Sequence, residues 1–317
     1  MPEIPVFDGP SVLAAISVEE AIERVRDGFV RFAHGEWRMP PKVYLQAAPE
    51  GEGDFRAMPA AGGGLAVLKW VTSFPGNPAR GLPTVTGVIC VSSLADGEPL
   101  ALVDARAVTA LRTGAVAAVA GQELAREDAS SVGMIGCGLH GAWAGRCLAA
   151  AEYGPGVCFD PDPDAAGALA GELGWEVGSR EDALAQDVVT CVTPGHEAVV
   201  ARGDLRPGMH LSMLGADGAG KAEADVEAVA RCSLFCDEWE QAAHGGELTG
   251  AVEAELVARA EVTELGDVLT GRRPGRTGPE EVTLFDSTGL AIQDLALCHA
   301  LLDGLDRGDV RARTVRL

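Results

Sequence analysis

The feature that most constrains the fold of this chain is a glycine-rich turn between an apolar strand and a helix. Gly136, Gly138 and Gly141 form a GxGxxG motif directly after the apolar run 132–135, and a helical pattern begins at the third glycine. Such glycines allow a tight turn and a close approach to a pyrophosphate, whose charge the helix N-terminus favours. Since 41 glycines make chance matches easy, the position of the motif between strand and helix gives it weight. The motif predicts a dinucleotide site.

The segment that follows the motif alternates strands and helices. Helical patterns over about 141–151 and 165–173 separate strand-like runs, and this alternation is typical of a parallel sheet with helices on both faces. We therefore predict an α/β fold with a Rossmann-type parallel-sheet domain. The strand-like runs are residues 132–135, 157–159, 187–192, 210–214, 234–236 and 282–285.

The N-terminal third has a different texture. Ser17 and Glu20 form a capping-box pattern, and apolar residues then recur at helical spacing up to about residue 33. Short β-rich runs between Gly, Pro and Asn turns predict an antiparallel or mixed sheet, and an alanine-rich helix pattern covers 107–124. Residues 290–305 indicate a last amphipathic helix that packs back on this part. The β-rich runs are residues 43–45, 65–71, 85–91 and 100–103.

These patterns predict two domains, the first of them discontinuous. A chain of 317 residues is long enough to bury two cores. We expect residues 1–117 to form an α+β substrate-binding and dimerisation domain and residues 118–289 to form the dinucleotide-binding domain. Residues 290–317 would then return to the first domain.

The charge balance excludes whole classes of partner. The chain has 47 acidic and 25 basic side chains, a net charge of −22, so we expect neither nucleic acid nor an anionic membrane as partner. No apolar run approaches the roughly 18 residues of a membrane span, and no signal-peptide pattern begins the chain, which favours a cytoplasmic location. The eight cysteines are scattered and lack zinc-ligand spacing, so we expect buried reduced thiols and no metal site.

An acidic residue follows the second strand of the alternating segment. Asp160 lies about 24 residues after Gly136, where a carboxylate would accept hydrogen bonds from the adenosine ribose and repel a 2′-phosphate. This position favours NAD over NADP, although Asp160 could instead only open the turn 161–163. Thr193 ends the next strand and would lie beside the dinucleotide at the carboxyl edge of the sheet.

Three cations interrupt apolar, strand-like sequence in the N-terminal third. Lys42, Arg56 and Lys69 each stand among apolar neighbours, and Lys42 and Lys69 are two of the three lysines in the chain. A cation in such a place needs a partner. They could be surface cations on half-exposed strands, but three such segments together favour an anion-binding pocket.

Over nearly its whole length the chain resembles the ornithine cyclodeaminase and mu-crystallin family, and within it the archaeal-type alanine dehydrogenases. The agreement is dispersed and keeps the same order along the chain, which makes it more specific than the glycine motif alone. The matching segments are residues 39–45, 54–60, 68–85, 111–114, 135–138, 215–218 with 220–221, 240–241 with 244–247, and 285–289 running into Gln293 and Asp294.

The resemblance implies a fold, a cofactor and a substrate class. It implies a homodimer formed by the N-terminal sheet and the C-terminal helix, NAD(H) on the Rossmann-type domain, and a small amino or imino acid in the cleft between the domains. Lys42, Arg56, Lys69 and Arg112 would surround the substrate, and Asp217 would complete the site. The candidate cofactor contacts are Thr84, Arg112, Thr113, Gly136, Gly138, Leu139, His140, Asp160, Thr193, Ala216, Asp217 and Ser287.

Oxidation of an α-amino acid requires a fixed carboxylate and a route for protons. Arg56 can hold the carboxylate with its planar fork of donors, and Lys42 can add a second positive contact. Lys69, flanked by Leu68 and Trp70 and near other cations, should have a lowered pKa that suits a general acid/base. Asp217 could share this task or hold the ammonium group, and the two could act as a coupled pair.

Several polar residues have alternative roles. Arg112 and Thr113 would contact the cofactor phosphate or the substrate carboxylate, although Arg112 could instead form an interdomain salt bridge. Ser287 and Thr288 could bind the nicotinamide end or cap the helix that follows. His244 precedes two glycines, so a role in a turn is as plausible as catalysis.

The function expected from these residues is NAD-dependent oxidative deamination of L-alanine to pyruvate and ammonia, with the reverse amination. In the ornithine enzymes of the family a glutamate occupies the place of Arg56, and a cation there suits a short acid better than a diamino acid. The alternatives are reduction of another small imino acid, such as iminosuccinate or a cyclic ketimine, and ornithine-type cyclodeamination. A crystallin-like NAD(P)- and ligand-binding protein is the non-enzymatic alternative.

Overall fold

The computed structural model describes residues 3–47, 53–195, 197–218 and 220–316. The chain divides into two compact units, unit 1 with Met1–Arg112 and Leu290–Leu317, and unit 2 with Thr113–Gly289. The C-terminal helix thus belongs to unit 1. The division at Arg112 falls within one continuous helix, α3 (Ala105–Leu124), whereas the sequence pattern puts the boundary at residue 117.

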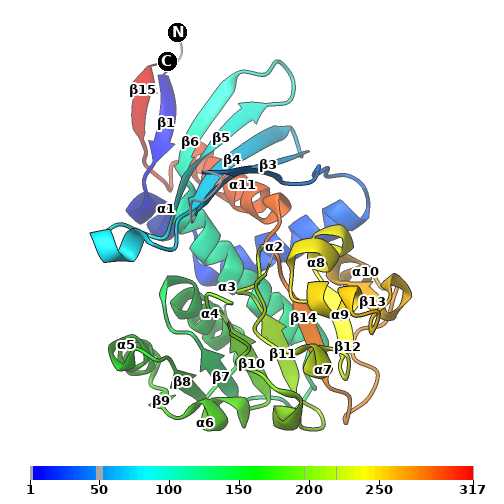
Figure 1. The fold of residues 1–317 in the computed structure, drawn as a ribbon. Helices are drawn as coiled ribbons and strands as arrows, with labels where there is room; N and C mark the ends of the chain where they lie inside the picture. Colours follow the sequence, from blue (N-terminus) through cyan, green and yellow to red (C-terminus); the bar gives the residue numbers. More distant parts are fainter. Residues whose placement is uncertain (1–2, 48–52, 196, 219, 317) are drawn as a thin grey trace. The chain divides into compact units, whose positions relative to one another are not determined.

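Unit 1 is built, in its described residues, on a seven-stranded mixed sheet in which only β1 and β6 pair in parallel. Strands β1 and β15 lie side by side (Figure 1), and Glu3 pairs with Arg316. Helix α11 packs on α2 and on strands β3 and β4. In sheet order the strands are β15 (Arg313–Arg316), β1 (Glu3–Phe7), β6 (Pro99–Asp104), β5 (Val85–Ser93), β4 (Leu65–Ser73), β3 (Asp54–Gly62) and β2 (Val43–Gln46), and the helices besides α3 are α1 (Gly9–Ala15), α2 (Val18–Ala33), η1 (Asn77–Arg80) and α11 (Ala291–Arg307).

The structure confirms most of the elements predicted for unit 1. Helix α2 begins after Ser17, whose hydroxyl oxygen accepts the backbone N–H of Glu20 at 3.1 Å. Strands β1 and β15 are absent from the prediction, and β3 is anticipated only as strand-like sequence around Arg56. Strand β3 contains Pro59 in its middle, and a proline removes a ladder donor and argues against a strand. The last helix is not simply amphipathic, because its polar residues Gln293 and Asp294 are both fully buried.

Strand β4 has two chemically different faces. Residues 65, 67, 69 and 71 are buried, whereas Leu68 and Trp70 between them are 43% and 37% exposed. This alternation follows from the period of two of a β-strand. The strand therefore carries Lys69 into the core and presents apolar side chains on the opposite face.

Unit 2 has, within its described residues, an eight-stranded sheet in which every neighbouring pair is parallel. The first strand, β7, lies between β8 and β10, so the chain leaves it on one side and later returns on the other. Ligands of such sheets bind at the carboxyl ends of the strands beside this reversal. In sheet order the strands are β13 (Val262–Glu264), β12 (Ser233–Cys236), β14 (Thr283–Asp286), β11 (His210–Met213), β10 (Val188–Cys191), β7 (Val132–Ile135), β8 (Gly156–Phe159) and β9 (Glu176–Val177).

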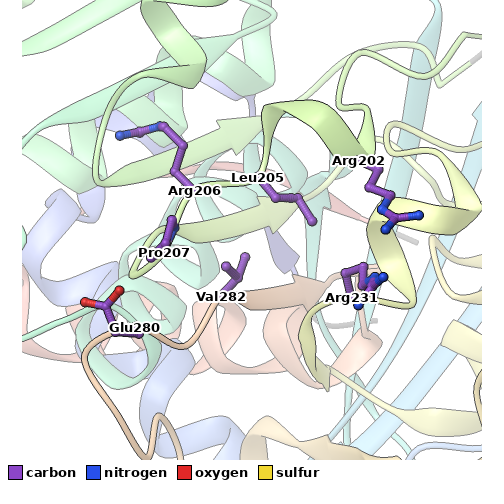
Figure 2. Close-up of a pocket in the computed structure, with 7 residues that line it drawn as sticks. All are labelled: Arg202, Leu205, Arg206, Pro207, Arg231, Glu280 and Val282. Atoms are coloured by element: carbon purple, nitrogen blue, oxygen red, sulfur yellow. The ribbon is translucent and has the colours of Figure 1, made fainter.

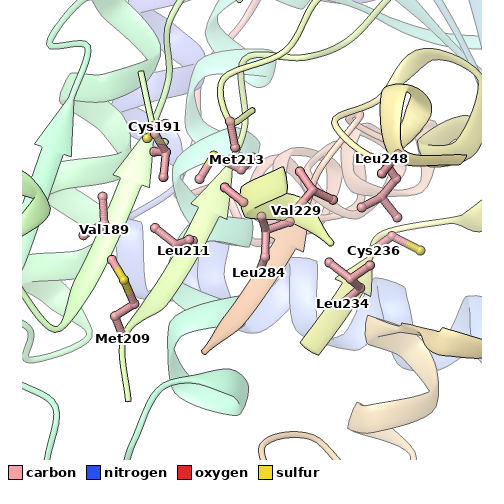
Figure 3. Packing of buried hydrophobic residues seen from close by; sticks show 14 of the residues in the cluster. Val189, Cys191, Met209, Leu211, Met213, Val229, Leu234, Cys236, Leu248 and Leu284 are labelled. Atoms are coloured by element: carbon pink, nitrogen blue, oxygen red, sulfur yellow. The ribbon is translucent and has the colours of Figure 1, made fainter. Parts of the chain in front are cut away.

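The core of unit 2 consists of small and medium apolar side chains. Val189, Leu211 and Leu284 project from three neighbouring strands, and Leu248 from a connecting segment packs near them (Figure 3). This core holds the strands in the register that fixes the loops at their carboxyl ends. The helices of the unit are α4 (Leu139–Ala150), α5 (Pro163–Leu173), α6 (Arg180–Leu184), η2 (Arg202–Asp204), α7 (Val226–Val229), α8 (Trp239–Gly245), α9 (Thr249–Glu253), η3 (Arg259–Glu261) and α10 (Leu265–Leu269).

The cysteines differ in one respect from the expectation. All eight are free thiols, but Cys90 is exposed on the outer face of β5 and Cys232 is half-buried, because strand alternation turns Cys90 away from the core. In the described part of the chain, no helix combines the length and the hydrophobicity that a membrane span requires.

Candidate functional site

The glycine turn of unit 2 has the geometry that its sequence predicts. Gly136 has φ +92°, and a Cβ there would lie 2.4 Å from the carbonyl oxygen of Val192. A Cβ at Gly141 would lie 1.9 Å from the carbonyl oxygen of Gly136, whereas a Cβ at Gly138 would meet no atom within 4 Å. Packing thus requires glycine at positions 136 and 141, whereas Gly138 keeps the backbone open on the side a ligand would approach.

Helix α4 begins directly after this turn without a side-chain cap. Its N-cap is Gly138, so no side chain covers the first N–H groups of the helix. Unpaired N–H groups at a helix N-terminus favour an anion. The residues present therefore fit the pyrophosphate of a dinucleotide.

Asp160 supports the glycine turn from the end of β8. Its Oδ2 accepts the backbone N–H of Cys137 at 2.7 Å, and its Oδ1 accepts that of Asp162 at 2.9 Å. The bond to Asp162 fits the role in the turn that the sequence left open as an alternative. The bond to Cys137 was not predicted. A carboxylate has about four acceptor sites, so these two bonds leave capacity for ribose hydroxyls.

Glu223 joins the two loops that follow β10 and β11, a role that sequence reasoning missed. Its carboxylate accepts the N–H of Thr193 at 2.6 Å and the N–H of Gly215 at 2.7 Å. The residue is fully buried, and burial raises the pKa of its carboxyl. Glu247 in turn accepts the N–H groups of Glu223 and Ala224, and burial raises the pKa of Glu247 to about 7. No motif marks these carboxylates.

The loop after β11 carries Asp217, which forms an ion pair. Lys221 Nζ lies 2.6 Å from Asp217 Oδ1, and both side chains are partly exposed. Ala216, just before Asp217, is fully buried. The only lysine outside the N-terminal third thus neutralises the carboxylate that the resemblance placed at the substrate.

Ser287 and Thr288 do not cap the last helix. The N-cap of α11 is Leu290, and its N–H is accepted by the Gln293 side chain at 3.1 Å. The two hydroxyls instead donate to the buried carboxylate of Asp237 at the end of β12, at 3.3 Å and 3.1 Å. Of the two alternatives for these hydroxyls, helix capping is wrong, because the side chain of Gln293 accepts the N–H of Leu290. The contacts with Asp237 were not predicted.

In unit 1, Lys69 is buried against a carboxylate from helix α11. The side chain of Lys69 is 1% exposed, and its Nζ lies 3.0 Å and 3.1 Å from the two carboxylate oxygens of Asp294. Burial lowers the pKa of Lys69 to about 8; Arg112 and Arg56 also lower it, and Asp294 raises it. The predicted direction is confirmed, but the cause is not Leu68 and Trp70, which lie on the opposite face of the strand.

Arg56 and Arg112 form with Lys69 a set of three buried cations, which we call the cation group. Arg56 Nε and Nη2 donate to Asp54 at 2.6 Å and 3.2 Å, and the guanidinium lies 5.4 Å from the centre of the Tyr44 ring. Arg112 Nη1 donates to Gln293 Oε1 at 3.3 Å. These contacts hold the cations at defined positions in a chain of strongly negative charge.

A hollow of about 360 Å³ lies in unit 2, and Figure 2 shows the residues that line it. Its residues precede or flank the amino ends of β11 and β14, whereas the glycine turn lies at the carboxyl end of β7. Arg206 points away from it (Figure 2) and donates to the carbonyls of Leu184 and Gln186, and Arg202 pairs with Glu227 at 3.3 Å. These arginines stabilise local structure. The hollow is lined by Arg202, Leu205, Arg206, Pro207, Arg231, Glu280 and Val282.

Residues 8–308 match the model of the ornithine cyclodeaminase/mu-crystallin family. The chain belongs to this family. It is 40% identical over 299 residues to an alanine dehydrogenase of Archaeoglobus fulgidus, with 92% of each chain covered. A solved structure described as an archaeal alanine dehydrogenase dimer with bound NAD superposes with a TM-score of 0.94 at 37% identity over all of both chains. The iminosuccinate reductase of Paracoccus denitrificans in complex with NAD⁺ gives a TM-score of 0.90 at 28% identity, again over all of both chains.

The family match spans both units and all the residues that the resemblance singled out. The remaining predicted site residues are uncharged or only half-buried. His244, in α8, donates a hydrogen bond from its Nδ1 to the carbonyl of Glu240 and is well exposed. The others lie as follows: Lys42 just before β2, Thr84 just before β5 with its carbonyl accepting from Phe74, Thr113 buried in α3, and Leu139 and His140 in the first turn of α4.

Proposed function

We propose that this protein is an NAD-dependent alanine dehydrogenase. It would convert L-alanine, NAD⁺ and water into pyruvate, ammonium, NADH and a proton, and catalyse the reverse amination. The observation that carries the proposal is the cation group, in which Lys69 is buried with Arg56 and Arg112 in unit 1. Bound NAD⁺ would supply the acceptor for the hydride that leaves Cα.

The unit 2 residues that would hold NAD are those of the glycine turn and Asp160. The uncapped start of α4 would face the pyrophosphate, and Gly138 would leave the space it needs. Asp160 would accept ribose hydroxyls and repel a 2′-phosphate, which supports NAD over NADP.

The cation group suits the carboxylate of a small acid. Asp54 and Asp294 pair with Arg56 and Lys69, and Arg112 adds a further positive charge near Lys69. A substrate carboxylate beside these cations would accept charge-assisted hydrogen bonds. Alanine and pyruvate each carry one such carboxylate.

Lys69 can move a proton near neutral pH. A pKa of about 8 leaves about a tenth of the side chains neutral at pH 7, whereas a lysine at 10.5 would be neutral in roughly one molecule in 3,000. We infer that Lys69 takes the proton from the attacking water or returns it in the reverse direction. Asp217, paired with Lys221, is the second candidate for this traffic.

The outer face of the unit 1 sheet suits a homodimer. Leu68 and Trp70 of β4 pair in register with Cys90 and Val88 of β5, and all four are exposed on that face. Exposed apolar patches of this kind mark protein–protein contacts. We infer that a second copy of this chain covers the patch.

The test is an assay of NADH consumption at 340 nm with pyruvate and ammonium. We expect turnover that needs both, and little turnover with NADPH. The same assay with oxaloacetate and ammonium tests iminosuccinate reduction, and proline formation from ornithine tests cyclodeamination. A kcat/KM for either of these above that for pyruvate would contradict the proposal, and ligand binding without any turnover would support the crystallin-like alternative.

A further inference from the structure

Asp294 is a buried carboxylate to which neither the glycine motif nor the cation pattern gave a role. It is fully buried in the first turn of α11, and both of its oxygens lie within 3.1 Å of Lys69 Nζ. A carboxylate in such a place is retained only with a partner, because an unpaired buried charge costs several kcal/mol. Its partner here is the lysine that the proposed function uses.

The neighbouring residue on the helix holds a second member of the cation group. Gln293 Oε1 accepts from Arg112 Nη1 at 3.3 Å and from the N–H of Leu290 at 3.1 Å. Because both partners are donors, the oxygen of this amide and not its nitrogen must face them. Two consecutive side chains of one helical turn thus hold Arg112 and Lys69.

We propose that Asp294 is a positioning residue that fixes Lys69 Nζ in place and sets the pH range in which Lys69 exchanges its proton. The inference rests on the proposed function, in which Lys69 carries the proton. It does not make Asp294 itself a catalytic residue, because the contacts of Asp294 reach the reaction only through Lys69.

The charges around Lys69 make the direction of the effect definite. The titratable groups that act on it are Asp294 and Cys298 on α11, Arg112 on α3 and Arg56 on β3. Burial raises the pKa of the Cys298 thiol, so this group stays neutral, and both arginines stay protonated. Of these groups in the described part of the chain, Asp294 is the one that favours the protonated amine. Its replacement by a neutral residue must therefore lower the pKa of Lys69.

The experiment uses the small number of lysines. Protein labelled with ¹³C at lysine Cε should give one resonance each for Lys42, Lys69 and Lys221, and Lys69→Met assigns the one of interest. We expect the Lys69 signal of the wild type to titrate at about 8 and that of Asp294→Asn about 1 to 3 pH units lower. The control is Asp303→Asn on the same helix, whose partly exposed carboxylate pairs with Arg24 at 2.7 Å. It should leave the midpoint of Lys69 unchanged, and an unchanged midpoint in folded Asp294→Asn would overturn the proposal.

Kinetics separate this inference from the proposed function. In alanine oxidation the neutral lysine is the active form, so the acidic limb of kcat should move to lower pH in Asp294→Asn, with little change in the Kd of NADH. A wild type without alanine turnover would refute the proposed function, while the NMR titration would still test Asp294. If Asp294→Asn does not fold, the wild type provides the test, since a scalar coupling across the hydrogen bond from ¹⁵Nζ of Lys69 to ¹³Cγ of Asp294 is expected at pH 6. Its absence in a resolved Lys69 signal would overturn the inference.

Discussion

Glu223 offers the sharpest test of how the loops of unit 2 are held. Its carboxylate receives the N–H of Thr193 at 2.6 Å and that of Gly215 at 2.7 Å. In Glu223→Gln the amide has one oxygen for two donors, so one buried N–H faces the NH₂ group. An unsatisfied buried donor costs about 1 to 3 kcal/mol, and loss of the negative charge weakens the bond that is kept.

This cost should appear as weaker dinucleotide binding. The loops can relax in the free protein but must be ordered again around the ligand, so a cost of about 1.4 kcal/mol or more raises the Kd about tenfold or more. Calorimetric titration with NADH measures the Kd, and amide exchange at Thr193 and Gly215 should become faster. The matched control is Glu227→Gln, whose side chain is 71% exposed beside Arg202. A Kd for Glu223→Gln within twofold of the wild type, with unchanged exchange, would refute the reasoning.

Three further outcomes are expected. Lys69→Ala should abolish alanine turnover but leave the Kd of NADH within about threefold, since Lys69 lies in unit 1; retained turnover would remove Lys69 from the mechanism. Glu247 has a pKa raised to about 7 from 4.5 in the folded state, so its contribution to stability is present below pH 4.5 and is lost as the pH rises to 7. The free energy of unfolding of the wild type relative to Glu247→Gln should fall by up to about 3 kcal/mol across this range, and a pH-independent difference would contradict this. Trp70→Glu should shift the mass measured by light scattering from dimer to monomer, and an unchanged dimer would place the interface elsewhere.

Local patterns were enough to predict the parts of the fold that depend on neighbouring residues. The glycine turn and strand β7 follow from ten consecutive residues, and the start of α2 follows from Ser17 and Glu20. The lowered pKa of Lys69 could also be predicted, because any lysine inside an apolar strand loses hydration.

The partners of these residues could not be predicted in the same way. Asp294 meets Lys69 across 225 positions of sequence, and Asp237 meets Thr288 across 51. In the sequence nothing distinguishes Glu223 from a surface glutamate, because the two N–H groups that it accepts come from distant loops. Such pairs arise from tertiary packing, which carries no short-range signal in one sequence.

Strand β4 carries both the lysine of the proposed mechanism and the surface of the proposed dimer. It sends Lys69 into one face of the sheet and Leu68 and Trp70 to the other, so a single inserted or deleted residue would exchange the two sets. After such a shift the amine of Lys69 would lie on the exposed face, which is the proposed dimer surface. The indole of Trp70 would lie on the buried face, among the guanidinium groups. Evolutionary length variation in this region should therefore be confined to the turns at residues 63–64 and 74–84, while the strand between them keeps its length.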